Sequence, residues 1–136
     1  MATPANARSA AVLVIDDQPF FTTMLRNVLE QQGFRVQVAA SGPEGLALAK
    51  KQPPDAILLD IEMPGMNGFV VCEQLKQDAD LKHIPVVVLT GTNDPKLNEK
   101  AFKAGAEIVA LKAVSNERLV NMLRLALAKG KPARPG

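Results

Sequence analysis

The chain has few of the residues from which disulfide-bonded and zinc-binding proteins are built. It has one cysteine, Cys72, which excludes an intrachain disulfide and a zinc cluster based on cysteine. It has one histidine, His83, which excludes a metal site made of several histidines and a mechanism that needs a histidine pair. We expect Cys72 to be a packed apolar residue of a helix and His83 to lie in a surface loop.

Long hydrophobic runs are also lacking. No apolar run approaches the roughly 18 residues of a membrane span, and the first ten residues, MATPANARSA, do not have the pattern of a secretory signal. Hydrophobic residues nevertheless make up 47% of the chain, as in an ordinary globular core. We expect a cytoplasmic domain over 11–128 that does not contact a membrane, with tails or linker stubs at 1–10 and 129–136.

The chain shows little excess of charge of one sign. The chain contains 16 lysines and arginines and 14 acidic residues, which gives a formal net charge of +2. Four of those basic residues lie in the two predicted tails, which hold no acid, so the body carries 12 basic and 14 acidic residues. A mildly acidic body disfavours direct binding of nucleic acid by this domain.

What the sequence does contain is a regular alternation of two patterns. Short apolar runs, four of them nearly continuous, predict strands buried on both faces at 11–15, 34–40, 55–59, 85–89 and 107–111. Helical spacing of apolar residues predicts helices at 19–32, 43–51, 68–77, 95–104 and 115–129. This alternation predicts an α/β fold, a flavodoxin-like (βα)5 doubly wound sandwich with a parallel five-stranded sheet in the order 2-1-3-4-5.

Polar residues gather at the carboxyl ends of the predicted strands. Asp16 and Asp17 follow the first apolar run and Asp60 follows the third, while Thr90 closes the fourth strand and Lys112 the fifth. Taken singly, each has a simpler explanation: a helix cap, a turn former, a strand terminus or a surface lysine. Because ligands of open α/β sheets bind at this edge, their joint occurrence indicates a functional site.

The residue types indicate phosphoryl chemistry. Three carboxylates close together repel one another unless a cation neutralises them, and hard oxygen ligands favour Mg²⁺ or Mn²⁺ over zinc. A lysine can offset charge on phosphoryl oxygens and a hydroxyl can donate to one of them. One carboxylate is then the nucleophile, as in aspartyl-phosphate chemistry.

Four motifs carry a family resemblance: VLVIDD (12–17), LLDIEMPGMNG (58–68), LTG (89–91) and LK (111–112). In sequence and spacing they resemble the receiver domain of two-component response regulators, the chemotaxis-regulator-like family. The resemblance covers residues 11–128. The segment after the third apolar run is the most specific of the four.

The resemblance implies a role for each matching residue. Asp60 matches the phosphoacceptor, Thr90 the switch hydroxyl and Lys112 the lysine that pairs with the phosphoryl group. The metal ligands that it implies are carboxylates and one backbone carbonyl: Asp16 (mainly through water), Asp17, Asp60 and the carbonyl group of Glu62.

Two positions depart from the family pattern. Val109 stands where Tyr or Phe is common, so an aromatic rotamer switch cannot operate there. Ala113 stands where proline is common, and a cis peptide bond before a residue other than proline costs about 2.5–4 kcal/mol. Neither position supplies a phosphate or metal contact, so we expect the chemistry at Asp60 to survive.

The resemblance implies that a sensor histidine kinase or a histidine phosphotransfer protein donates the phosphoryl group, and that an output partner or a linked output domain responds. Such a domain is not an enzyme beyond its own phosphorylation and dephosphorylation. One alternative is a pseudo-receiver, a protein-interaction scaffold that works without phosphorylation. Another is a flavodoxin-like nucleotide- or flavin-binding enzyme, which the first strand–helix junction, IDDQPF, disfavours because it lacks a glycine-rich phosphate loop.

Two helices have faces that bear on partners. Lys96, Lys100 and Lys103 share a face of the fourth helix, which is either solvated or a docking surface for an acidic partner. The last helix has more apolar residues than one face needs, and we expect the surplus, around Val120 and Leu127, to contact a second protomer or an output domain. A homodimer would then form through the fourth and fifth helices.

Overall fold

The computed structural model describes residues 9–63, 65 and 67–130, in which five strands alternate with five helices. In chain order these elements are β1 (Ala11–Ile15), α2 (Pro19–Gln31), β2 (Arg35–Ala39), α3 (Gly42–Lys51), β3 (Ala56–Asp60), α4 (Gly68–Gln77), β4 (Val86–Thr90), α5 (Pro95–Lys103), β5 (Ile108–Leu111) and α6 (Asn116–Gly130). Most of the two predicted tails, and Pro64 and Met66 of the loop after β3, lie outside the described residues.

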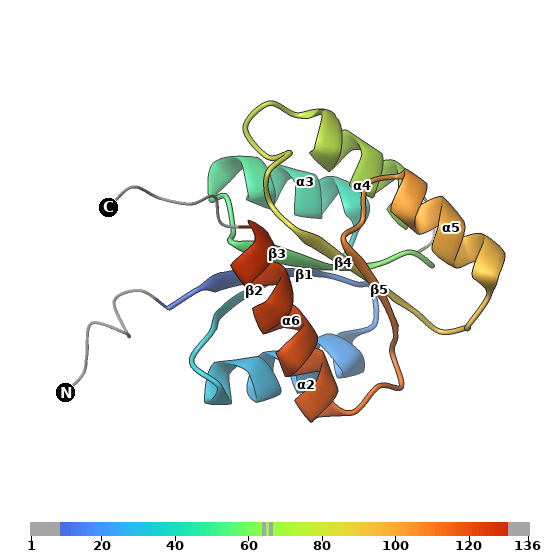
Figure 1. Cartoon of the computed structure of the whole chain (residues 1–136). Helices are drawn as coiled ribbons and strands as arrows, with labels where there is room; N and C mark the ends of the chain where they lie inside the picture. Colours follow the sequence, from blue (N-terminus) through green and yellow to red (C-terminus); the bar gives the residue numbers. More distant parts are fainter. Residues whose placement is uncertain (1–8, 64, 66, 131–136) are drawn as a thin grey trace.

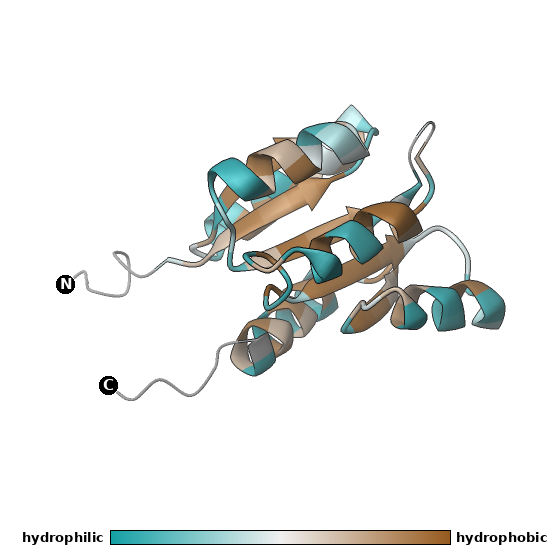
Figure 2. Cartoon of the chain, turned by 90° about the horizontal axis from the view of Figure 1, so that it is seen from above, coloured by the Kyte–Doolittle hydropathy of each residue, from teal (hydrophilic) through white to brown (hydrophobic). Residues whose placement is uncertain are grey.

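The strands form one parallel sheet in the order β2-β1-β3-β4-β5, so the predicted fold class and strand order are confirmed. Helices cover both faces: α3, α4 and α5 lie on one side and α2 and α6 on the other (Figure 1). Viewed from above, the apolar strands lie between helices whose outer surfaces are largely hydrophilic (Figure 2). This order makes β1 and β3 neighbours in the middle of the sheet.

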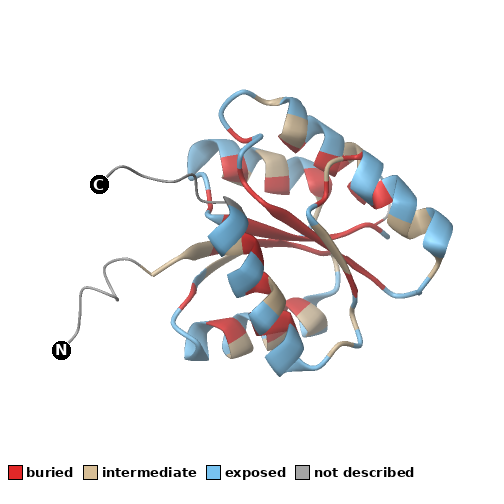
Figure 3. Ribbon diagram, in the orientation of Figure 1, coloured by how far each residue is buried: buried red, intermediate tan, exposed pale blue. Residues whose placement is uncertain are grey.

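The hydrophobic core has two halves, one on each face of the sheet. Leu13 and Ile15 of β1 belong to the half under α3, α4 and α5, whereas Val12 and Val14 belong to the half under α2 and α6. Side chains of a strand point alternately to opposite faces, so a strand covered on both sides must be apolar throughout. Strands β3 and β4 are buried along their whole length (Figure 3), which explains their continuous apolar runs.

The third strand extends one residue further than its apolar run predicts. Asp60 was expected to follow the strand, but it is the last residue of β3 and pairs with Leu89 of β4. Thr90 closes β4, as predicted, and pairs with Leu111. Backbone pairing continues past the last apolar side chain because the neighbouring strands still offer hydrogen-bonding partners.

The expectation for the outer face of the last helix is wrong for Val120. This residue is 5% exposed and packs in the core half under α2 and α6, and Leu127 is half-buried against the same half. The helix also lies beside the end of α2, where Arg124 of α6 donates to Oε1 of Gln32, so more of its apolar residues find cover than a single stripe on the sheet requires. Leu125, which is 55% exposed, is the large apolar residue of α6 that faces solvent.

Other single-residue predictions concern α4, α5 and the loops. Cys72 is buried in α4 and His83 is exposed in the turn before β4, as predicted. Lys96, Lys100 and Lys103 are all exposed on α5, and the Lys100 ammonium lies 4.7 Å from the centre of the Phe69 ring of α4. Within the described part of the chain, no helix combines the length and the apolar character needed to cross a membrane.

Candidate functional site

Three aspartates meet at the carboxyl edge of the sheet. Asp16 and Asp17 follow β1, and Asp60 ends the neighbouring strand β3. One carboxylate oxygen from each lies within 4.8 Å of the others. Asp16 and Asp60 are each 2% exposed, while Asp17 is half-buried. The structure thus brings together the three carboxylates that the sequence predicts to converge.

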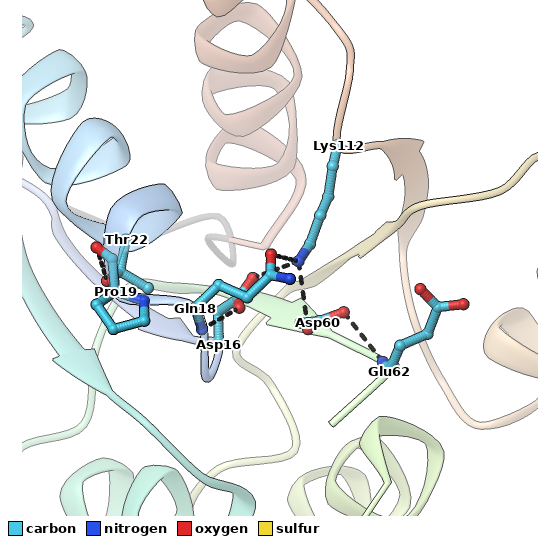
Figure 4. A network of polar contacts seen from close by, with 7 residues as sticks. All are labelled: Asp16, Gln18, Pro19, Thr22, Asp60, Glu62 and Lys112. Carbon is cyan, nitrogen blue, oxygen red and sulfur yellow. Dashed lines mark hydrogen bonds and ion pairs between the residues drawn. The ribbon is translucent and has the colours of Figure 1, made fainter. Parts of the chain in front are cut away.

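The two buried carboxylates are fixed in the same way. Oδ1 of Asp16 accepts a hydrogen bond from the backbone N–H of Gln18 at 2.9 Å, and Oδ1 of Asp60 accepts one from the N–H of Glu62 at 3.0 Å. Each is an Asx-type contact to the residue two positions on. The other oxygen of each, Oδ2, faces the Lys112 ammonium, at 2.9 Å for Asp16 and 3.3 Å for Asp60 (Figure 4).

Lys112 reaches this edge from the loop after β5 and has further partners. Its backbone N–H donates to the carbonyl oxygen of Thr90 at 2.8 Å. Its ammonium donates to Oε1 of Gln18 at 3.0 Å and lies 4.8 Å from the centre of the Phe21 ring. Sequence reasoning did not predict Gln18 or Phe21 as neighbours of the site. The one available signal was a glutamine before Pro19, where a helix more often begins with Ser, Thr, Asp or Asn.

Burial and charge shift the pKa values of this cluster. Burial raises the pKa of Asp16, and repulsion from Asp60 adds to the shift, although hydrogen bonds from Lys112 and Gln18 oppose it. Burial by itself lowers the pKa of Lys112, but Asp16 and Asp60 outweigh this effect and the pKa lies above its usual value. Lys112 is therefore an ammonium group throughout the physiological pH range.

The donor set fits a hard divalent cation. Asp16, Asp17 and Asp60 offer convergent carboxylate oxygens, and the single ammonium of Lys112 balances only one of their three negative charges. Mg²⁺ binds one or two carboxylates and retains water, which suits a cluster whose Asp17 reaches the surface. The Glu62 side chain is exposed and points away from Asp60 (Figure 4), so it does not join the cluster. A contribution from its carbonyl group stays a prediction.

The Thr90 hydroxyl is engaged within its own loop. Thr90 is 1% exposed; its hydroxyl donates to the carbonyl oxygen of Thr92 at 3.1 Å and accepts from the Thr92 N–H at 3.2 Å. Val109 is half-buried and packs against the core half under α3, α4 and α5. The Lys112–Ala113 peptide bond is trans, as the absence of proline predicts.

A parallel sheet of this order, with three carboxylates and a lysine at its carboxyl edge, defines the receiver class of signalling domains. The chain belongs to this family: the model of the response regulator receiver domain matches residues 12–124.

Several curated and solved proteins are similar to the chain. PilH of Pseudomonas aeruginosa is 36% identical over 119 residues, which cover 88% of this chain and 98% of PilH. Response regulator PleD of Caulobacter vibrioides is 37% identical over 116 residues, 85% of this chain but only 26% of PleD. The solved structure of the chemotaxis protein CheY4 of Vibrio cholerae has a TM-score of 0.83 at 30% identity and covers 87% of this chain and 98% of that one. The chain thus spans nearly the whole of some relatives and about a quarter of another.

Proposed function

We propose that the chain is a phosphoacceptor receiver that takes a phosphoryl group onto Asp60 from a phosphohistidine of a sensor histidine kinase or a histidine phosphotransfer protein. The observation that carries this proposal is the setting of Asp60. Its carboxylate is buried at the end of the central strand β3, 3.3 Å from the Lys112 ammonium and beside two further carboxylates. Membership of the receiver family supports the same role.

The reaction is a transfer between two nucleophiles. An oxygen of the Asp60 carboxylate attacks phosphorus, an O–P bond forms, and the P–N bond of the phosphohistidine breaks with its electron pair passing to the imidazole nitrogen. The N–H of Glu62 holds Oδ1 of Asp60, and Lys112 faces Oδ2, so the carboxylate is oriented before the donor arrives. Lys112 is also placed to attract the phosphoryl oxygens as they reach Asp60.

Asp16, Asp17, Asp60 and the carbonyl group of Glu62 would hold Mg²⁺ or Mn²⁺. Such a cation, when bound, neutralises charge on the phosphoryl oxygens. The support for it is the convergence of the three carboxylates and the raised pKa of Asp16, which burial and the nearby Asp60 produce.

The response to phosphorylation starts at Thr90. Its hydroxyl would exchange its two hydrogen bonds with Thr92 for one to a phosphoryl oxygen, and the loop between β4 and α5 would move with it. The phosphoryl group then shifts the population between two conformations because it binds one of them better. With Val109 in β5, this rearrangement proceeds without a rotating aromatic ring.

A partner protein or a linked output domain would respond to the phosphorylated state. We also propose that two copies of the chain form a homodimer through α5 and α6. Phe102 (51% exposed) on α5 and Leu125 on α6 are large apolar residues that these two helices expose. The proposed location is the cytoplasm. The chain would catalyse only its own phosphorylation and dephosphorylation.

The test uses phosphoramidate, a small donor with a P–N bond, in the presence of Mg²⁺. Intact mass spectrometry of the full chain should show the gain of one phosphoryl group, and chelation of the metal should abolish it. Asp60→Asn should show no gain, whereas Asp80→Asn, which removes an exposed carboxylate after α4, should behave as wild type. Absence of the gain in wild type, or its persistence in Asp60→Asn, would contradict the proposal. Partner binding that ignores Asp60→Ala would instead indicate the scaffold function.

A further inference from the structure

Gln18 occupies a position whose usual task it does not perform. It is the N-cap residue of α2, with extended backbone angles (φ −99°, ψ 105°), but its side chain makes no capping hydrogen bond. Ser, Thr, Asp and Asn are favoured at N-caps because their short side chains accept from the first free N–H groups of the helix. The longer side chain of Gln18 instead reaches Lys112, 94 residues further along the chain, and accepts from its ammonium at 3.0 Å.

The contacts of Lys112 show what this hydrogen bond adds. An ammonium group has three N–H donors. Around it lie the carboxylates of Asp16 and Asp60, with which it forms ion pairs, and Oε1 of Gln18, to which it donates a hydrogen bond (Figure 4). The face of the Phe21 ring, from the first turns of α2, covers another side at 4.8 Å. Gln18 is thus the one uncharged oxygen partner among the three, and like Phe21 it belongs to the start of α2.

We propose that Gln18 is a positioning residue, whose carboxamide oxygen holds the Lys112 ammonium beside Asp60 for phosphoryl transfer. This inference rests on the proposed function. Asp16 and Asp60 are also the residues proposed to hold the cation and to accept the phosphoryl group, so their hold on Lys112 weakens when those ligands bind. Gln18 has no such second task, and its contact persists through the reaction.

The loop that carries Lys112 explains why the lysine side chain needs a contact with α2. Ala113 follows the lysine, so no proline ring stiffens the backbone there. The backbone N–H of Lys112 is fixed on Thr90, but the flexible side chain beyond it must be ordered by contacts at its far end. A hydrogen bond from α2 orders it in advance, and such preorganisation favours the transition state over the resting state.

The first arm of the test measures unfolding of the metal-free full chain in urea, so it requires neither a cation nor phosphorylation. It compares wild type, Gln18→Leu, Lys112→Met and the double variant. Leucine keeps the approximate size of the side chain and removes the acceptor. We therefore expect Gln18→Leu to lower the free energy of unfolding when Lys112 is present, and to change it little when Lys112 is already methionine. Gln18→Glu again offers an acceptor oxygen, so the effect of residue 18 on the free energy of unfolding should again depend on whether Lys112 is present.

The second arm measures the rate of Asp60 phosphorylation by phosphoramidate with Mg²⁺. We expect Gln18→Leu to slow it about three- to tenfold, as for the net loss of one ordinary, solvent-exposed hydrogen bond, and to have no further effect in Lys112→Met. The matched control is Gln32→Leu: Gln32 is the residue that follows α2, at the opposite end of the helix from Gln18, and its Oε1 likewise accepts from a cation, Arg124, at 3.1 Å. It should leave the rate unchanged.

The outcomes separate this proposal from the function on which it rests. In one contrary result, Gln18→Leu changes the free energy of unfolding, or the phosphorylation rate, by the same amount in wild type and in Lys112→Met. That result would show that Gln18 acts independently of Lys112, and it would overturn the proposal. A wild-type rate in Gln18→Leu would also overturn it. If wild type itself takes no phosphoryl group, the proposed function fails, and the unfolding arm alone then decides whether Gln18 positions Lys112.

Discussion

Replacing Gly68 with alanine tests whether the close approach of α4 to the end of β3 fixes the strand that carries Asp60. Gly68 is the first residue of α4, and a Cβ atom there would lie 2.4 Å from the Cα atom of Ile61 and 2.6 Å from the carbonyl oxygen of Asp60. Non-bonded carbon atoms normally lie about 3.5–4.0 Å apart. Both obstructing atoms belong to the backbone, so no side-chain rotation relieves the clash, and α4 must move away by about 1 Å.

Two opposing effects set the size of the loss. Overpacking of this kind costs about 1–3 kcal/mol, whereas alanine in place of glycine gains at most about 1 kcal/mol inside a helix. The gain is smaller at the first helical position, so we expect the free energy of unfolding of Gly68→Ala to fall by about 0.5–3 kcal/mol. That loss corresponds to a melting temperature roughly 2–12 °C lower. Circular dichroism during thermal and urea denaturation measures both quantities.

Gly33→Ala is the control that separates lost stability from a displaced site. Gly33 has φ +94° and no other atom within 4 Å of an added Cβ, so alanine there suffers backbone strain of about 1 kcal/mol but no clash. Gly33 follows α2 at the end remote from Asp60. Both variants should lose stability, and only Gly68→Ala should also slow phosphorylation of Asp60. A Gly68→Ala protein as stable as wild type would refute the reasoning.

Two further predictions concern single ionisable groups. Burial raises the pKa of the Cys72 thiol to about 11, so the folded chain should not react with a thiol reagent at pH 8, and one thiol should react in urea; rapid reaction of the native chain would contradict this. Asp78, at the end of α4, accepts a hydrogen bond from Lys50 of α3 at 2.8 Å, which together with the Asp80 N–H lowers the pKa of Asp78 below its usual value. Its stabilisation is therefore present at neutral pH and lost as the pH falls through the lowered native pKa. The urea midpoints of wild type and Asp78→Asn should differ at pH 7 and approach each other as the pH falls below the usual range of an aspartate carboxyl. A gap that stays constant with pH would show that the ion pair is not its cause.

The elements and their order could be predicted from the sequence because each depends on local pattern. The apolar runs gave the five strands, with ends within one residue of those observed, and helical spacing gave the five helices. The convergence of Asp16, Asp17 and Asp60 follows from strand order alone, since β1 and β3 are adjacent in any sheet of this order. The fold and the candidate site could therefore be predicted together, because the carboxyl ends of neighbouring parallel strands meet at one edge of the sheet.

The features that could not be predicted depend on how elements cross one another. The burial of Val120 follows from the packing of α6 beside α2 in one core half, which its helical periodicity does not specify. The bond between Gln18 and Lys112 joins residues 94 positions apart through the reach of two long side chains. The requirement for glycine at position 68 arises from the distance between α4 and the chain after β3, a property of packing and not of composition.

The local charge at the site, and not the net charge of +2, determines what the domain can bind. When ionised, Asp16, Asp17 and Asp60 carry three negative charges, and Lys112 balances one of them. A divalent cation matches the remaining excess of two. In the proposed reaction a phosphoryl group would bring about −1.5 to −2 charges in place of the single negative charge of Asp60, so the demand for positive charge would increase. Under the proposed function, Lys112 would have to stay close while its carboxylate partners bind the cation and the phosphoryl group, and the hydrogen bond proposed for Gln18 would meet that need.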